Sequence, residues 1–151
     1  MAFKWLTRLI PEASEPGKDS SDLSRAIAVL MLEVAQSDFE ETEEETSTLL
    51  AGLIEHVGES EQRPQDLLAA ARSDKAKSAG LYEFTRLACT EMNMAERCSL
   101  VEQLWRIAYA DGVIDKYEEA AIRKVSELLY VPHSDFIKAK LTAAGAANNT
   151  P

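Results

Sequence analysis

The sequence predicts an all-α protein, a compact single-domain bundle of about seven helices. Apolar residues recur at intervals of three and four along most of the chain, which is the period of a helix with one buried face. Only 6 glycines and 5 prolines occur in 151 residues, and no Asn-Gly pair signals a β-hairpin. A chain of this length can bury a sizeable core within one domain.

Residues 1–21 differ in composition from the rest of the chain. Residues 2–10, AFKWLTRLI, can place Phe3, Leu6 and Leu9 on one helical face, with Lys4 and Arg8 beside it. Residues 11–21 are rich in proline, serine and charge, and so predict a linker. The short basic segment suits contact with a membrane surface or a partner protein. The favoured alternative is packing against its own domain, or against a second copy in a homodimer.

Two helices should follow, separated by an acidic loop at residues 38–41. The first should begin near Ser21 or Asp22. The second opens at Thr42, whose side chain can cap the helix while Glu45 reaches back, and it is expected to end at Gly58. The residues expected to be buried on these two helices are Leu23, Ile27, Leu30, Met31, Val34, Leu49, Leu50, Leu53, Ile54 and Val57.

The middle of the chain contains two further predicted helices. Pro64 suits the first turn of a helix, and the DLLAAA that follows it favours helix strongly. Gly80 marks a break before LYEFTRLACTEM, in which Tyr82 is expected in an apolar stripe.

The last third predicts another set of helices. Asn93 with Glu96 forms one capping box, and Asp115 with Glu118 forms a second. Pro132 separates the second of these helices from a final one, SDFIKAKL. Residues 142–151 are expected to form a disordered tail.

The chain also contains a weak internal repeat. Aligning the first half with the second places helix, acidic loop and capped helix in the same order. The aligned pairs are Val34 with Ile107, Ala35 with Ala108, Asp38 with Asp111, Thr42 with Asp115, Glu45 with Glu118, and Leu49 with Ile122. The bundle should therefore consist of two pseudo-repeat halves.

The acidic loop of the second half is a candidate cation site. Asp111, Asp115 and Glu118 surround Gly112, and hard cations such as Ca²⁺ and Mg²⁺ prefer carboxylate oxygens brought together by backbone turns. The segment overlays the second half of an EF-hand loop but lacks acids at its first two ligand positions. The competing interpretation is structural, because Asp115 and Glu118 are explained by the helix cap alone. Asp111 is not.

Composition and motifs exclude several functions. A net charge of −10 disfavours binding to nucleic acid. The longest apolar run, Ala26 to Leu32, is far shorter than the roughly 20 residues of a transmembrane helix. Cys89 and Cys98 lack zinc-ligand spacing and are expected in the core of a cytoplasmic protein. No nucleophile, phosphate-loop or metalloprotease motif is present, so we expect no enzymatic activity.

Residues 22–141 resemble the TerB-like family, all-helical bacterial proteins named for tellurite resistance. The likeness is most specific in "W-x-x-A-Y-A-D-G", from Trp105 to Gly112, and extends through VEQLWRIAYADGVIDKYEEAAIRKVSELLYVPHSDFIKAKL. LMLEVAQSDFEETEEE and LYEFTR also fit, and similar domains are attached to DnaJ-type co-chaperones. The resemblance implies a two-half helical bundle with a divalent-cation site formed by Asp38, Glu41 and Glu45 together with Asp111, Asp115 and Glu118.

One departure from the family pattern concerns the first loop. Phe39 stands where the family usually has glycine, and Thr42 where the second half has Asp115, which makes cation binding by the first loop less favourable. The resulting expectation is a non-enzymatic stress-response module that binds a divalent cation, Ca²⁺ or Mg²⁺, through its acidic loops. The alternative is an interaction adaptor without metal, with an unidentified protein partner and peripheral membrane contact through the N-terminal segment.

Overall fold

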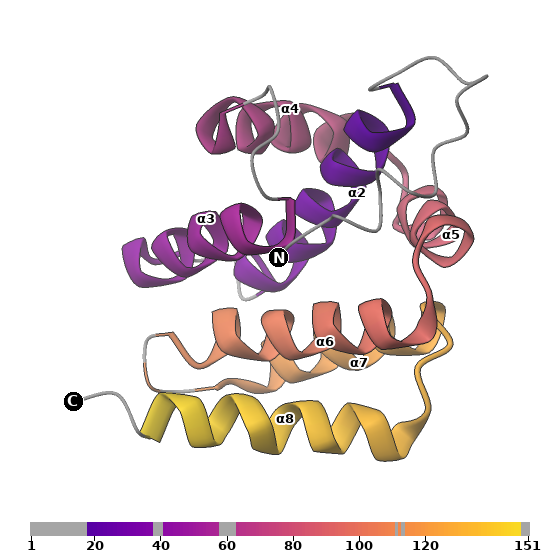
Figure 1. Ribbon diagram of the computed structural model, residues 1–151. Helices are drawn as coiled ribbons and strands as arrows, with labels where there is room; N and C mark the ends of the chain where they lie inside the picture. Colours follow the sequence, from indigo (N-terminus) through magenta and orange to yellow (C-terminus); the bar gives the residue numbers. More distant parts are fainter. Residues whose placement is uncertain (1–17, 38–40, 58–62, 111, 113, 149–151) are drawn as a thin grey trace.

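The protein is an all-α bundle, as the sequence predicts (Figure 1). The computed structural model describes residues 18–37, 41–57, 63–110, 112 and 114–148. Within these ranges it contains seven helices and no strand. The helices are α2 (Lys18–Ala35), α3 (Glu43–Val57), α4 (Pro64–Lys77), α5 (Tyr82–Glu91), α6 (Met94–Ala108), α7 (Lys116–Leu128) and α8 (His133–Asn148).

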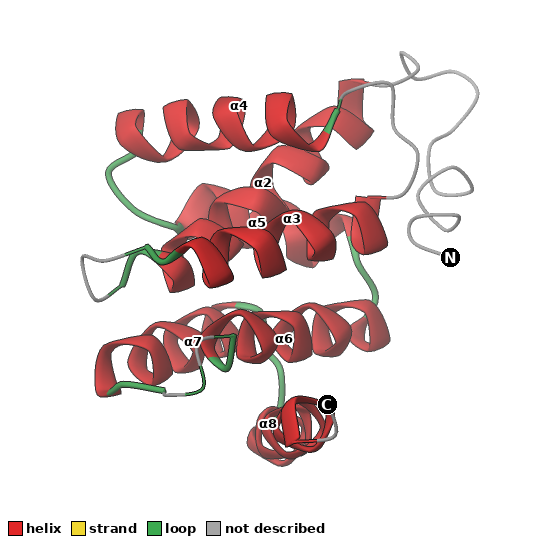
Figure 2. Ribbon diagram, turned by 90° about the vertical axis from the view of Figure 1, so that its left-hand side faces the viewer, coloured by secondary structure: helices red, strands yellow, loops and turns green. Residues whose placement is uncertain are grey.

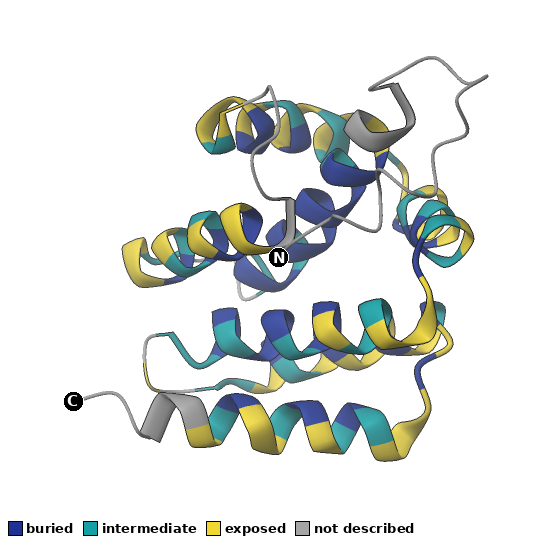
Figure 3. Cartoon of the chain, in the orientation of Figure 1, coloured by how far each residue is buried: buried dark blue, intermediate teal, exposed yellow. Residues whose placement is uncertain are grey.

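Helix α2 forms the centre of the bundle. It packs against α3, α4, α5, α6 and α7. Every residue from Ala26 to Leu32 is buried, because this run is apolar on all sides and its helix can only be accommodated in the interior (Figure 3). The neighbouring helices, in contrast, each bury one face and leave the other to solvent.

Helices α6, α7 and α8 form the second half of the bundle (Figure 2). Trp105 of α6 is fully buried, and its ring centroid lies 5.3 Å from that of Phe136 on α8 and 6.2 Å from that of Tyr109. Lys140 of α8 lies over the same indole, with Nζ 5.3 Å from the ring centroid. This aromatic cluster explains why α8 packs mainly on α6.

Ion pairs link α4 to α2. The guanidinium of Arg25 donates two hydrogen bonds to the carboxylate of Asp74, at 2.6 and 2.7 Å. Lys75 Nζ lies 3.6 Å from Glu33 Oε1. The bidentate Arg25–Asp74 pair fixes orientation as well as charge, and so sets how α4 lies across α2.

The two halves of the bundle match at the repeat spacing. Helices α2 and α6 end at Ala35 and Ala108, which are aligned residues of the repeat. Helices α3 and α7 begin at Glu43 and Lys116, which are separated by the same interval in the sequence. The repeat read from the sequence therefore corresponds to a structural repeat around the two acidic loops.

Several local predictions were wrong. Ile54 was expected inside but is 56% exposed, and Tyr82, expected in an apolar stripe, is 68% exposed. Helix α8 continues through residues 142–148, where a disordered tail was expected. Alanine is the strongest helix former, and Ala143 is buried against the bundle, so the helix extends beyond its amphipathic part. Helix α2 likewise begins at Lys18, inside the expected linker.

Other predictions fall on residues that the structure does not describe. These are the N-terminal segment 2–10, most of the linker, and the stop at Gly58. Among the helices of the described ranges, none combines the length and the hydropathy that crossing a bilayer requires.

Candidate metal centre

The candidate site lies where α3 and α7 begin, and the same capping box forms both starts. In α3, the backbone N–H of Thr42 donates to Glu45 Oε1 at 3.0 Å, and the Glu45 N–H donates to Thr42 Oγ1 at 3.1 Å. In α7, the Asp115 N–H donates to Glu118 Oε1 at 3.2 Å, and the Glu118 N–H donates to Asp115 Oδ1 at 2.8 Å. The capping boxes predicted at Thr42 and at Asp115 are confirmed.

Glu45 and Glu118 are buried, which a capping role does not require. They are 0% and 1% exposed, whereas Glu96, the corresponding glutamate of the α6 capping box, is only partly buried. Removing a carboxylate from water is costly unless the environment compensates the charge. The burial of both glutamates therefore indicates a role beyond helix capping.

The two glutamates meet across the pseudo-repeat. Glu45 acts on the carboxyl group of Glu118 through both hydrogen bonding and charge, although the two residues come from opposite halves of the sequence. Each uses Oε1 for its own helix cap, and neither Oε2 accepts a hydrogen bond from any N–H or O–H donor of the described residues. The site thus holds two buried carboxylate oxygens with unused acceptor capacity.

The electrostatics of the pair favour a bound positive charge. Burial, together with the hydrogen bond and charge of Glu45, raises the pKa of Glu118 to about 9, while the Asp115 backbone N–H opposes this shift. Two adjacent buried carboxylates cannot both remain ionised without a counter-charge. Either a shared proton or a cation can supply that charge at neutral pH.

The donor chemistry fits a hard divalent cation. Carboxylate oxygens are the ligands that Ca²⁺ and Mg²⁺ prefer, and the two Oε2 atoms are free to serve. The pair alone is not a full ligand set, and within the described ranges no group of three or more His, Cys, Asp or Glu side chains is arranged to hold a metal ion. A complete site would need further oxygens from the adjoining loops and from water.

Glu41, a predicted ligand, is engaged elsewhere. Arg72 of α4 donates two hydrogen bonds to its carboxylate, at 2.7 and 2.8 Å, and Gln36 and the hydroxyl of Thr46 also donate to it. The Arg72 hydrogen bonds lower the pKa of Glu41 to about 2. This residue therefore ties the first acidic loop to α4.

Of the remaining predicted ligands, one lies beside the glutamate pair and two lie outside the described residues. Asp115 caps α7 through Oδ1, beside the pair. Asp38 and Asp111 lie outside the described residues, as does Phe39. Gly112 has φ +86°, a conformation that a side chain disfavours, so the turn of the second loop depends on its glycine.

Sequence reasoning did not foresee two features of this site. It assigned Glu45 and Glu118 to one shared cation site but did not predict that they form a buried, directly interacting pair, and it gave no role to Arg72. The internal repeat was a signal for the pairing of the glutamates, because Glu45 and Glu118 are equivalent residues of its two halves. The Arg72–Glu41 contact had none, since it joins two distant parts of the chain without any pattern.

Comparison with known proteins agrees with this architecture. The family model for TerB, described as tellurite resistance protein TerB, matches residues 24–141. Neither the curated proteins nor the solved structures gave a match. The family match covers most of the chain, including both capping boxes and both buried glutamates, and the chain therefore belongs to the TerB family.

Proposed function

We propose that this protein is a non-enzymatic TerB-type module that binds a divalent cation, Ca²⁺ or Mg²⁺, between the first turns of α3 and α7. The observation that supports this proposal is the buried pair Glu45 and Glu118, each with an Oε2 atom that no N–H or O–H donor of the described residues satisfies. A counter-charge at this position relieves their repulsion and compensates their loss of water.

Each half of the chain contributes to the proposed site. Glu45 and Glu118 would supply one oxygen each, because their other oxygens are committed to the helix caps. Asp38 and Asp111 are acids upstream of the two capping boxes at equivalent positions of the repeat, and they are proposed to complete the site, with Asp115 beside it. A bound cation would supply positive charge and link the two halves, and no chemical reaction is involved.

Calorimetric titration with Ca²⁺, Mg²⁺ and Mn²⁺ tests the proposal. Wild-type protein should bind at least one of these cations with a stoichiometry of one, and Asp111→Asn should weaken that binding. Glu44→Gln is the matched control, since Glu44 is exposed and adjacent to Glu45. The absence of any binding heat or thermal shift in the wild type would rule out the cation site.

The second candidate function is an interaction adaptor without metal. It is favoured by the raised pKa of Glu118, because one shared proton can stabilise the pair by itself. In that case Asp115→Ala should lower stability by about 1 kcal/mol to the same extent with and without divalent cations. A loss of stability that appears only in the presence of the cation would contradict it.

We further propose a cytoplasmic stress-response role, with membrane contact through residues 2–10 as a variant of the adaptor function. The basis is the amphipathic, basic sequence of that segment. Co-sedimentation with anionic liposomes that disappears when residues 2–10 are deleted would support the variant. Equal sedimentation of both chains would contradict it.

A further inference from the structure

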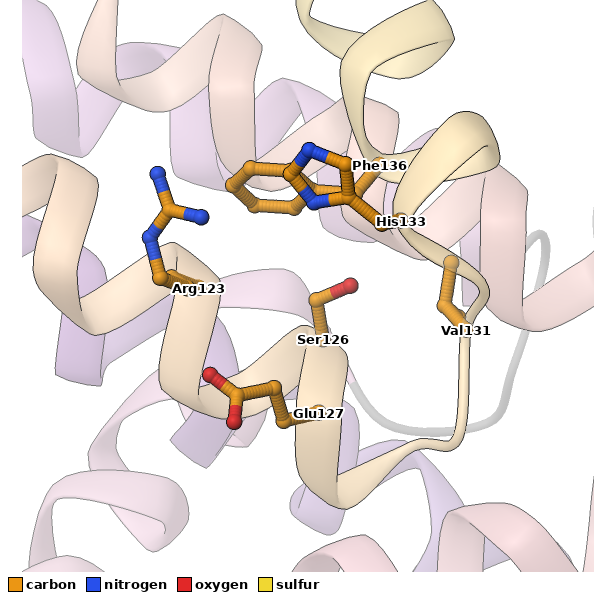
Figure 4. A pocket seen from close by; sticks show the side chains of 6 residues that line it. All are labelled: Arg123, Ser126, Glu127, Val131, His133 and Phe136. Atoms are coloured by element: carbon orange, nitrogen blue, oxygen red, sulfur yellow. The ribbon is translucent and has the colours of Figure 1, made fainter.

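A small pocket opens between the second half of α7 and the start of α8. Its volume is about 250 Å³. The residues that line it are Arg123, Ser126, Glu127, Val131, His133 and Phe136 (Figure 4). It includes none of the residues of the candidate metal centre, which lies at the opposite end of α7.

Aromatic contacts hold the basic groups of the pocket in place. The guanidinium carbon of Arg123 lies 4.9 Å from the centroid of the Phe136 ring. The His133 imidazole stacks on the same ring, at 5.8 Å between centroids and 27° between planes. The cation–π contact of Arg123 with the ring reduces the rotamer freedom that binding would otherwise remove.

The floor of the pocket adds a hydroxyl group. Ser126 is 2% exposed, and its side chain points into the space bordered by Arg123 and the two rings (Figure 4). Val131 adds an apolar wall, and the carboxylate of Glu127 points away from the rings (Figure 4). The pocket therefore offers a cation, a hydroxyl group and apolar surface within a space the size of one amino-acid residue.

A competing acid is present but weakly held. Arg123 Nη2 lies 3.3 Å from Glu119 Oε2, and both side chains are more than one-third exposed. Exposed pairs at this helical spacing contribute little stability, and this one engages only one nitrogen of the guanidinium. The other N–H groups of Arg123 can bind a second acceptor.

We propose that this pocket binds a carboxylate at the C-terminal end of a partner peptide. A planar carboxylate matches the guanidinium of Arg123 in shape and charge, and Ser126 can donate a further hydrogen bond. The last side chain of the peptide would pack on Val131 and the rings. A phosphate dianion fits less well, because Glu119 and Glu127 flank the site and repel the additional charge.

NMR titration of the ¹⁵N-labelled full chain tests this assignment. The probes are acetyl-alanyl-leucine with a free carboxylate, the same peptide as its C-terminal amide, sodium acetate, and inorganic phosphate. The free-acid peptide should cause saturable shifts at Ser126, His133 and Phe136, and the amide should not. Arg123→Gln should weaken binding at least about tenfold, and Glu119→Gln should tighten it because the competing acid is removed.

Two further variants separate recognition from folding. Lys124→Gln removes the same charge from the next residue of α7, which is exposed and does not line the pocket, and should leave binding unchanged. Ser126→Ala should weaken binding without loss of the folded spectrum. Unchanged affinity in Arg123→Gln, or no saturable shift with the peptide, would overturn the proposal. Equal affinity for acetate would overturn the peptide assignment, and tighter binding of phosphate would overturn the carboxylate assignment.

Discussion

The starts of α3 and α7 share a capping box and a buried glutamate but differ in almost everything around them. Thr42 caps one helix and Asp115 the other. Glu41, which is tied to Arg72, has Ile114 as its counterpart in the second half, and an isoleucine cannot form such an ion pair. The capping residue and the contact that anchors the loop therefore differ between the halves, whereas Glu45 and Glu118 are the same residue and both are buried. The comparison shows that the buried glutamate and its capping box are what the two helix starts have in common, whereas the contact with Arg72 belongs to the first half alone.

The largest expected effect on stability is at Gly52, whose counterpart in the second half is the buried Val125. A Cβ at Gly52 would lie 2.4 Å from Gln103 Nε2 and 2.7 Å from Gln103 Cδ, and Gln103 is itself buried. Gly52→Val copies the second half into the first and should lower the free energy of unfolding by about 1–3 kcal/mol, because the buried Gln103 side chain must move to admit the new methyl groups. Urea denaturation measures this loss. A change below about 0.5 kcal/mol, the size expected of an ordinary surface substitution, would show that the α3–α6 contact is more adaptable than the structure implies.

The pH dependence of stability tests the glutamate pair without cation. The pKa of Glu118 is raised in the folded state, so its contribution is fully present below its unfolded pKa of roughly 4.5 and is lost as the pH rises toward about 9. Stability measured in EDTA should therefore fall between these values, by at most about 1.4 kcal/mol per pH unit for one proton. Glu118→Gln should flatten this part of the profile, because the amide does not titrate. A wild-type profile that rises over the same range would contradict the pairing.

The N-caps of α3 and α7 should contribute equally to stability, although one is Thr42 and the other is Asp115. Thr42→Ala and Asp115→Ala should each lower stability by about 1 kcal/mol, because each leaves a backbone N–H of the first turn without its acceptor. Parallel thermal unfolding of both variants and of the double variant would show whether the two effects add. A loss at Asp115 several times larger than that at Thr42 would mean that the caps are not equivalent.

The smallest expected effect is at the loop anchor that only the first half has. Arg72→Gln should cost roughly 0.5–1 kcal/mol at neutral pH, since both partners are partly exposed. The pKa of Glu41 is lowered to about 2, so this contribution is present above roughly pH 4.5 and is lost as the pH falls toward 2. Lys77→Gln, an exposed site at the end of the same helix, is the control. Equal losses in the two variants would indicate a general charge effect instead of the Glu41 contact.

Local rules predicted most of the fold. Periodicity and capping residues gave the helices and both capping boxes at the candidate site, because each depends on neighbours within one turn. Ile54 and Tyr82 were misplaced because burial depends on which helices cover a face, and the helical stretch of residues 142–148 was missed because its packing on the bundle was not visible in the sequence. The acids of the candidate site were named from the sequence, but the contact between Glu45 and Glu118 required the arrangement of both halves in space.

The most direct test of the glutamate pair is the thermal shift caused by a divalent cation in Glu118→Gln. The amide keeps the size of the side chain and can hydrogen-bond to Glu45, so the variant should unfold in EDTA at a temperature no lower than the wild type. Saturating Ca²⁺ or Mg²⁺, at about one hundred times the Kd, should raise the Tm of the wild type by roughly 5–10 °C, corresponding to about 2.7 kcal/mol. Glu44→Gln should keep that shift and Glu118→Gln should lose it. A full shift retained in Glu118→Gln would contradict the role of the buried pair as the cation site.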